Sequence, residues 1–191
     1  MPPGDRTRPT TDRVREALFS AIAAWAGTAH LPPDEALAGL AFADLYAGSG
    51  AVGLEAASRG AAPVLLVEAN ERTARLTARN AADLGLTVRL QTGRVEQLVA
   101  GPSGVTTSGS AFDVAFLDPP YELAADAVSA VLARLVGHGW LAEDALVVVE
   151  RSRRGADLDW PVGVRKIWTR SYGETVLHFA APGPMPSEEP G

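Results

Sequence analysis

The stretch DLYAGSGAVG at residues 44–53 decides the fold of this chain. It ends an apolar run over 40–46, typical of a buried strand, and leads into a helical pattern over 52–59. Its three glycines have the spacing G-x-G-x-x-G, which allows a tight turn and a close approach of backbone to a ligand. The stretch predicts the first strand, cofactor loop and helix of an α/β domain.

The glycine spacing alone does not decide between NAD and S-adenosylmethionine. Asp44 favours the methyl donor, because an acid just before the loop suits a cationic amino group and repels a pyrophosphate. Glu68 ends the next apolar run, where an acid can bind ribose hydroxyls. A dehydrogenase is further disfavoured because the only lysine, Lys166, lacks a tyrosine four residues before it. A P-loop is excluded since no lysine follows the glycines, and a purely structural turn remains an alternative.

A second motif, Asp-Pro-Pro-Tyr at 118–121, follows another apolar run. Asp118 and the Pro119 carbonyl can each accept one N–H of a planar amine, so that its nitrogen lone pair points at a methyl donor. Pro120 stiffens the turn, and Tyr121 offers a ring on which a base can stack. The motif fits adenine, guanine or a glutamine amide, while a simple strand-ending turn is the alternative.

Strands alternate with helices along the chain. Strands are expected at 64–68, 87–91, 112–117 and 146–150, helices at 72–84 and 123–136, and an antiparallel strand pair at 164–171 and 175–180. The pattern predicts an α/β, Rossmann-like fold with a mainly parallel, doubly wound sheet and an antiparallel C-terminal pair. Both motifs fall at carboxyl ends of strands, where such sheets bind ligands, so they are expected to form one site.

The 191 residues suit a single domain, expected over 1–181 and followed by a disordered tail at 182–191. An N-terminal helix is expected at about 11–26. Its apolar part could be mistaken for a secretory signal, but Asp12 and Glu16 and the helical spacing favour an amphipathic helix. Residues 30–37 and 101–110 are expected to be connectors. With no run long enough to span a membrane, a cytoplasmic protein is expected.

The composition argues against a metal site, because the chain has no cysteine and its three histidines lie far apart in the sequence. A net charge of −6 is unusual for a nucleic-acid binder. However, residues 151–170 hold six basic residues against two acidic ones, and a second basic group lies in 6–15. These clusters predict contact with phosphates, with a solvated charged face as the alternative.

Four segments together resemble the RsmD family: RPTTDRVRE at 8–16, DLYAGSGAVGLEAASRGA at 44–61, FLDPPY at 116–121 and YGET at 172–175. These are bacterial methyltransferases that modify a guanine N2 in 16S ribosomal RNA. The resemblance implies a class I fold and direct transfer from S-adenosylmethionine, leaving S-adenosylhomocysteine, without a metal. It also implies the small ribosomal subunit or its assembly intermediate as partner, and we expect a monomer.

The resemblance implies that Asp118, Pro119, Pro120 and Tyr121 hold the guanine. The helix from Thr11 would close over the methionine end of the cofactor, with Thr10, Thr11 and Arg13 facing the site and Arg15 as a solvated charge. Near Arg94, Glu96 or the backbone would contact adenine. The full cofactor set is Asp44, Tyr46, Ala47, Gly48, Ser49, Gly50, Gly53, Glu68, Ala69, Thr11, Arg94 and Val95.

The chain departs from the family at its beginning. Family members carry a glycine- and arginine-rich stretch before the RPTTDR segment, whereas here only a few residues precede it, so either the start is truncated or RNA is bound differently. Rival functions are methylation of another amine, in DNA, RNA or a protein glutamine, and a non-catalytic RNA-binding assembly factor. Trp140, Trp160 and Trp168 could stack on RNA, but core positions are favoured.

Overall fold

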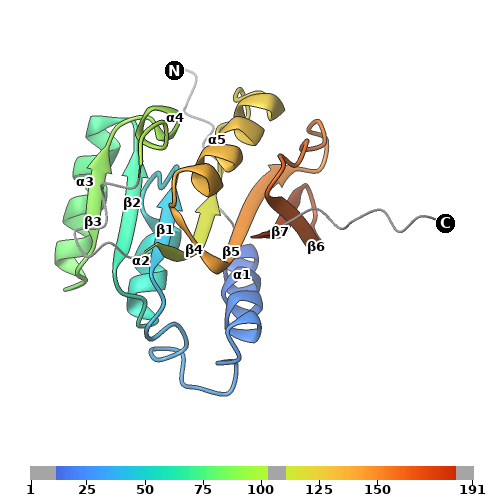
Figure 1. Cartoon of the computed structure of the whole chain (residues 1–191). Helices are drawn as coiled ribbons and strands as arrows, with labels where there is room; N and C mark the ends of the chain where they lie inside the picture. The colour runs from blue at the N-terminus through green and yellow to red at the C-terminus, as the bar shows by residue number, and fades with distance from the viewer. Residues whose placement is uncertain (1–11, 103–110, 184–191) are drawn as a thin grey trace.

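The computed structural model describes residues 12–102 and 111–183, which form a seven-stranded sheet covered by helices (Figure 1). The strands are β1 (Phe42–Leu45), β2 (Val64–Glu68), β3 (Arg89–Thr92), β4 (Phe112–Leu117), β5 (Leu141–Ser152), β6 (Val164–Tyr172) and β7 (Thr175–Pro182). The helices are α1 (Asp12–Trp25), α2 (Ala51–Ser58), α3 (Glu71–Asp83), α4 (Val95–Leu98) and α5 (Ala125–Gly137).

The strand order is β3-β2-β1-β4-β5-β7-β6. Strands β1 to β5 run parallel, while β7 is antiparallel to both β5 and β6. This architecture confirms the predicted mainly parallel α/β sheet with an antiparallel C-terminal pair. Because β1 lies between β2 and β4, the loop after β1 is adjacent to the residues that follow both neighbours.

Two hydrophobic clusters cover the two faces of the sheet. On one face, α1, α2 and α3 pack on strand residues such as Phe42, Leu66 and Phe116. On the other face, α4 and α5 pack on residues such as Leu45 and Leu117. Successive strand residues alternate between the clusters, as the two-residue period of a strand requires. Both faces are therefore buried, which explains why the strands are continuous apolar runs in the sequence.

Some boundaries differ from the predicted ones. The first strand ends at Leu45, because Tyr46 has a positive φ of 77° and leaves the extended region. Strand β5 begins at Leu141 and includes the exposed Glu143, which lengthens it beyond the predicted apolar core at 146–150. The four-residue α4 was not predicted, because one turn is too short to show helical periodicity.

The three tryptophans considered for RNA stacking all pack against the hydrophobic clusters, but to different depths. Trp140 is 1% exposed and stacks on Phe112. Trp168 stacks on Phe179 with their ring centroids 4.7 Å apart. Trp160 is half-buried against the cluster under α5. The favoured core position is confirmed for Trp140, whereas Trp160 and Trp168 are half-buried at the margin of the clusters.

Three predictions fall partly or wholly outside the described residues: Thr10 and Thr11, most of the connector at 101–110, and the tail from 184 onward. Within the described ranges, the model contains no helix of the length and hydropathy needed to cross a bilayer.

Candidate active site

The loop after β1 lies at the carboxyl ends of the strands and is held there by backbone hydrogen bonds. The Ala47 N–H donates to the Val67 carbonyl over 2.8 Å, and the Gly50 N–H donates to the Ala47 carbonyl over 2.8 Å. Gly48 and Gly50 have φ of 54° and 83°, in the left-handed region that favours glycine. These bonds and angles turn the chain sharply from β1 into α2.

The three glycines of the loop serve different purposes. A Cβ at Gly50 would lie 2.6 Å from the Thr77 Cγ2, and one at Gly53 would lie 2.9 Å from two atoms of Leu66. A Cβ at Gly48 would meet nothing within 4 Å. Gly50 and Gly53 are therefore required for close packing of the loop and α2, whereas the backbone at Gly48 is open toward a ligand.

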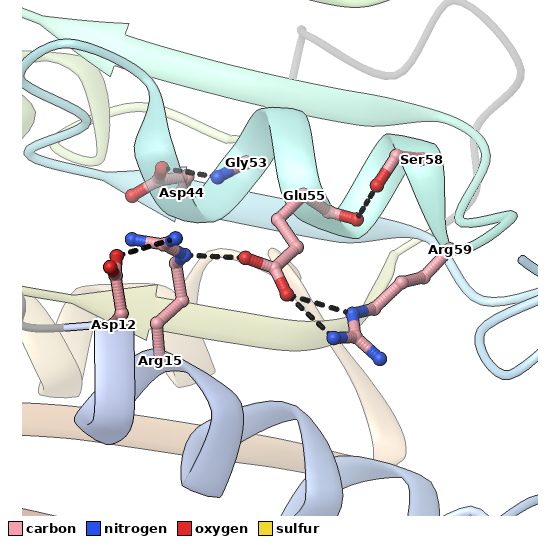
Figure 2. Close-up of polar contacts among 7 residues, drawn as sticks. All are labelled: Asp12, Arg15, Asp44, Gly53, Glu55, Ser58 and Arg59. Carbon is pink, nitrogen blue, oxygen red and sulfur yellow. Dashed lines mark hydrogen bonds and ion pairs between the residues drawn. The ribbon is translucent and has the colours of Figure 1, made fainter. Parts of the chain in front are cut away.

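Asp44 lies buried beneath this loop. Its Oδ2 accepts a 2.8 Å hydrogen bond from the Gly53 N–H, which fixes the start of α2 (Figure 2). Its Oδ1 is also buried and has no hydrogen-bond partner among the described residues. Burial raises the pKa of Asp44 to about 7, opposed by the Gly53 N–H and assisted by the charge of Glu68. A cationic amino group would give Oδ1 the partner it lacks, so the site fits the methionine end of S-adenosylmethionine.

Glu68 lies at the end of β2, beside the loop. Its Oε2 accepts from the Gly48 N–H over 2.9 Å, and its Oε1 accepts from the Asn70 N–H over 2.6 Å. Each carboxylate oxygen retains a further lone pair that can accept from a hydroxyl. The carboxylate therefore supports the loop and is placed for the predicted contact with ribose.

Thr77 is a member of the site that the sequence did not reveal. It is fully buried on α3, and its hydroxyl donates to the Gly48 carbonyl over 2.8 Å. Asn80, one turn further, donates to the Ser49 carbonyl over 3.4 Å. The loop is thus hydrogen-bonded to α3 as well as to β2. These contacts depend on how α3 packs beside the loop, and the sequence contains no signal for that packing.

The predicted adenine side of the site lies at α4. Arg94 is exposed at the N-terminus of this helix, and Val95 is buried behind it. The Tyr46 hydroxyl donates to Glu96 over 2.7 Å, which joins the loop to α4. Of the remaining predicted residues, Ser49 and Ala69 are exposed at the same edge.

The second motif lies directly beside the first. The Asp118 N–H donates to the carbonyl of Leu45, the last residue of β1, over 3.4 Å. Pro119 is buried, Pro120 is exposed, and Tyr121 is 61% exposed with its ring available for stacking. The Leu123 N–H donates to the Pro120 carbonyl over 2.9 Å and closes the turn. The fold therefore brings the two motifs together, as predicted.

The Asp118 carboxyl group is surrounded by charge. Its pKa is raised to about 8, mainly by burial and also by the charges of Glu150 and Asp44, while the charge of Arg151 lowers it. A cationic ligand bound at Asp44 would stabilise the ionised forms of both carboxyl groups.

Helix α1 is attached to α2 by an ion pair, which corrects the interpretation of Arg15 as a solvated charge. The Arg15 side chain is only about one quarter exposed and pairs with Glu55, which also accepts from Arg59 over 2.6 Å (Figure 2). Arg15 contacts Asp12 at 3.0 Å as well. A single sequence gives no signal for a contact 40 residues apart. Arg13, which was expected to face the site, is exposed in the first turn of α1.

A mainly parallel sheet of this order, with a glycine loop after β1 and acids at the ends of β1 and β2, defines a class I methyltransferase. The family model described as conserved hypothetical protein 95 matches residues 1–181. The chain therefore belongs to this family, the RsmD family, and the resemblance seen in the sequence is confirmed.

Individual relatives agree with this assignment. The chain is 33% identical to ribosomal RNA small subunit methyltransferase D of Escherichia coli K12 over 150 residues, which is 78% of this chain and 67% of the relative. The solved structure of the Escherichia coli protein yhhF has a TM-score of 0.75 at 26% identity, covering 93% and 90% of the two chains. The 16S rRNA N2 G1207 methyltransferase of T. thermophilus, solved with AdoMet and guanosine, shares the fold with a TM-score of 0.66 at 20% identity. The match covers 95% of this chain and 46% of that chain.

Proposed function

We propose that this protein transfers the methyl group of S-adenosylmethionine to the exocyclic N2 of a guanine in 16S rRNA of the small ribosomal subunit. One observation carries the proposal: the Asp118 N–H is bonded to the last residue of β1, so the amine-binding turn begins where the cofactor loop begins. The family membership supports the same reaction, because the Escherichia coli relative is named for small-subunit rRNA methylation.

The residues of the loop would hold the cofactor at three points. Asp44 Oδ1 would accept from its amino group, Glu68 would accept from its ribose hydroxyls, and the open backbone at Gly48 would allow close approach. Bound there, S-adenosylmethionine supplies an electrophilic methyl group on a sulfonium. The amino group is a cation in both the donor and its product, so the carboxylate of Asp44 would contribute to the affinity for both.

Asp118 and Pro119 would orient the nucleophile. The Asp118 carboxylate accepts one N–H of the guanine amine and the Pro119 carbonyl accepts the other, so that the nitrogen lone pair is directed at the methyl carbon. The N–C bond forms as the S–C bond breaks, and the nitrogen then loses one proton. Asp118 is the nearest base of the motif and would accept that proton. No covalent enzyme intermediate is required.

The surface beside the motif suits an RNA substrate. Tyr121 presents its exposed ring to a base turned out of a helix. Arg153 follows β5, and Arg170 on β6 is paired with Leu177 toward the same end of the sheet, where both are exposed and can contact phosphates. Arg165 and Lys166 are also exposed, but they lie near the other end of β6. We place the reaction in the cytoplasm and expect a monomeric enzyme.

The proposal is tested with labelled S-adenosylmethionine and small subunits prepared from cells that lack the modification. The label is expected to appear in 16S rRNA and to be recovered as N2-methylguanosine after digestion and mass analysis. Label in N6-methyladenosine, in DNA or in a protein glutamine would assign the site to another amine. Tight binding of the cofactor with no transfer to subunits, naked RNA or DNA would favour a non-catalytic assembly factor.

A further inference from the structure

Strand β5 places a second carboxylate beside Asp118. Leu117 of β4 is paired with Val149 of β5, and both pack under α5. One residue further along come Asp118, directly after the end of β4, and Glu150 of β5, which points to the opposite face from Val149 because successive strand residues alternate. The charge of Glu150 acts on the Asp118 carboxyl group. Glu150 is only 9% exposed. The register therefore puts two acidic side chains next to each other, with Asp44 of β1 on the same face.

Arg151 follows Glu150 on β5, and its cationic side chain leaves the strand on the opposite face from that of Glu150. An Nη2 proton of Arg151 is donated to the Leu123 carbonyl over 3.4 Å, at the end of the turn that contains Asp118. The Arg151 Nε is buried and has no hydrogen-bond partner among the described residues. Arg151 therefore lies beneath the amine-binding turn, while Glu150 lies beside its carboxylate.

We propose that Glu150 and Arg151 are positioning residues that together control whether Asp118 is a carboxylate during methyl transfer. The inference rests on the proposed function, since it concerns the group that accepts the amine proton. Neither residue belongs to the Asp-Pro-Pro-Tyr motif, and neither needs to touch the substrate. Glu150 opposes ionisation of its neighbour by repulsion, whereas Arg151 favours ionisation and also fixes the turn through Leu123.

The charges that face Asp118 come from three elements. Glu150 and Arg151 lie on β5, Asp44 lies on β1, and Asp118 follows β4. Glu150 and Asp44 raise the pKa of Asp118, Arg151 lowers it, and burial is the largest contribution. Because the pKa of Asp118 is near 8 without a ligand, a change in either β5 neighbour alters its ionised fraction at physiological pH.

The test is the pH dependence of single-turnover methyl transfer for the wild type, Glu150→Gln and Arg151→Gln. The rate should rise with pH as Asp118 ionises. We expect the midpoint of this rise to move down by about 0.5–1 pH unit in Glu150→Gln and up by about the same amount in Arg151→Gln. Glu143→Gln at the start of β5 and Arg79→Gln on α3 remove exposed charges of the same types away from Asp118 and should leave the midpoint unchanged.

A second readout does not depend on turnover. In protein labelled with ¹³C-carboxyl aspartate, the Asp118 resonance is identified by its loss in Asp118→Asn, and its titration is followed in each folded variant. Midpoints moving in opposite directions support the inference. Midpoints that stay fixed or move in the same direction overturn it. A wild type that transfers no methyl at any pH contradicts the proposed function, while this titration still decides the inference about β5.

Discussion

The two halves of the site are built in different ways. The cofactor loop is fixed by close packing, because Gly50 and Gly53 leave no room for a Cβ against Thr77 and Leu66. The turn at 118–121 is held by backbone hydrogen bonds and ends in the exposed ring of Tyr121. Changes in the tightly packed loop should therefore affect stability and cofactor affinity together. Changes in the turn should affect turnover while leaving the fold and cofactor affinity intact.

The largest combined effect is expected from Gly53→Ala. The new methyl group would meet Leu66 at 2.9 Å and the Asp44 Cβ at 3.1 Å, so the free energy of unfolding should fall by about 1–3 kcal/mol. Affinity for S-adenosylhomocysteine should fall at least tenfold, on the order of 1.4 kcal/mol. Both are measured by denaturant unfolding and calorimetric titration.

Gly85→Ala is the matched control, since Gly85 has a positive φ of 66° but an open surrounding. It should lose about 1 kcal/mol of stability through its backbone alone and keep cofactor affinity. Equal losses of affinity in the two variants would contradict the claim that the loop depends on close packing.

On the substrate side, Tyr121→Ala should raise the KM for small subunits by roughly tenfold or more, because base stacking contributes about 1–3 kcal/mol. Affinity for S-adenosylhomocysteine and the melting temperature should stay unchanged, since the ring is exposed. Tyr121→Phe retains the ring and should keep most of the affinity for subunits. A Phe variant as weak as the Ala variant would instead assign the effect to the hydroxyl.

Asp44→Asn separates stability from binding. The pKa of Asp44 is raised to about 7, so the folded state binds more protons than the unfolded state between about pH 4 and 7. The free energy of unfolding of the cofactor-free protein therefore falls as pH rises through this range. The Asn variant lacks this titration. The melting temperature of Asp44→Asn minus that of the wild type should therefore grow from pH 5 to pH 8. At pH 8 this difference should be larger than at pH 5 by about 2–4 °C.

Affinity of Asp44→Asn for S-adenosylmethionine should fall, because a neutral amide replaces the anion facing the amino group. The exposed Asp83→Asn provides the control and should show neither effect. A melting difference that shrinks with pH would contradict the assignment of a buried, uncompensated carboxylate at position 44.

The smallest expected effect concerns the α1 and α2 contact. A double-mutant cycle with Arg15→Gln and Glu55→Gln should give a coupling of about 0.5–1 kcal/mol, because both side chains are about one quarter exposed. The exposed pair of Arg75 and Glu71 on α3 should couple by only about 0.2–0.5 kcal/mol. A coupling no larger than that of the α3 pair would show that Arg15 behaves as a surface charge.

The sequence predicted the parts of the site that are local. The glycine spacing and the Asp-Pro-Pro-Tyr turn are short motifs whose chemistry can be inferred without neighbours, and alternating strands placed both at one edge. Thr77, Glu55 and Glu150 could not be identified in this way, because their roles depend on helix packing and strand register across long sequence separations. Tyr46 was assigned to the cofactor set, but its bond to Glu96 required the tertiary fold.

The central claim is that one pocket holds the methyl donor at the β1 loop and the amine at Asp118. It is tested most directly by measuring S-adenosylhomocysteine affinity and the single-turnover rate of methyl transfer in the same Asp118→Asn protein. The affinity is expected to stay within about threefold of wild type, and the rate is expected to fall by about 100-fold or more. A rate near that of wild type would contradict the central claim.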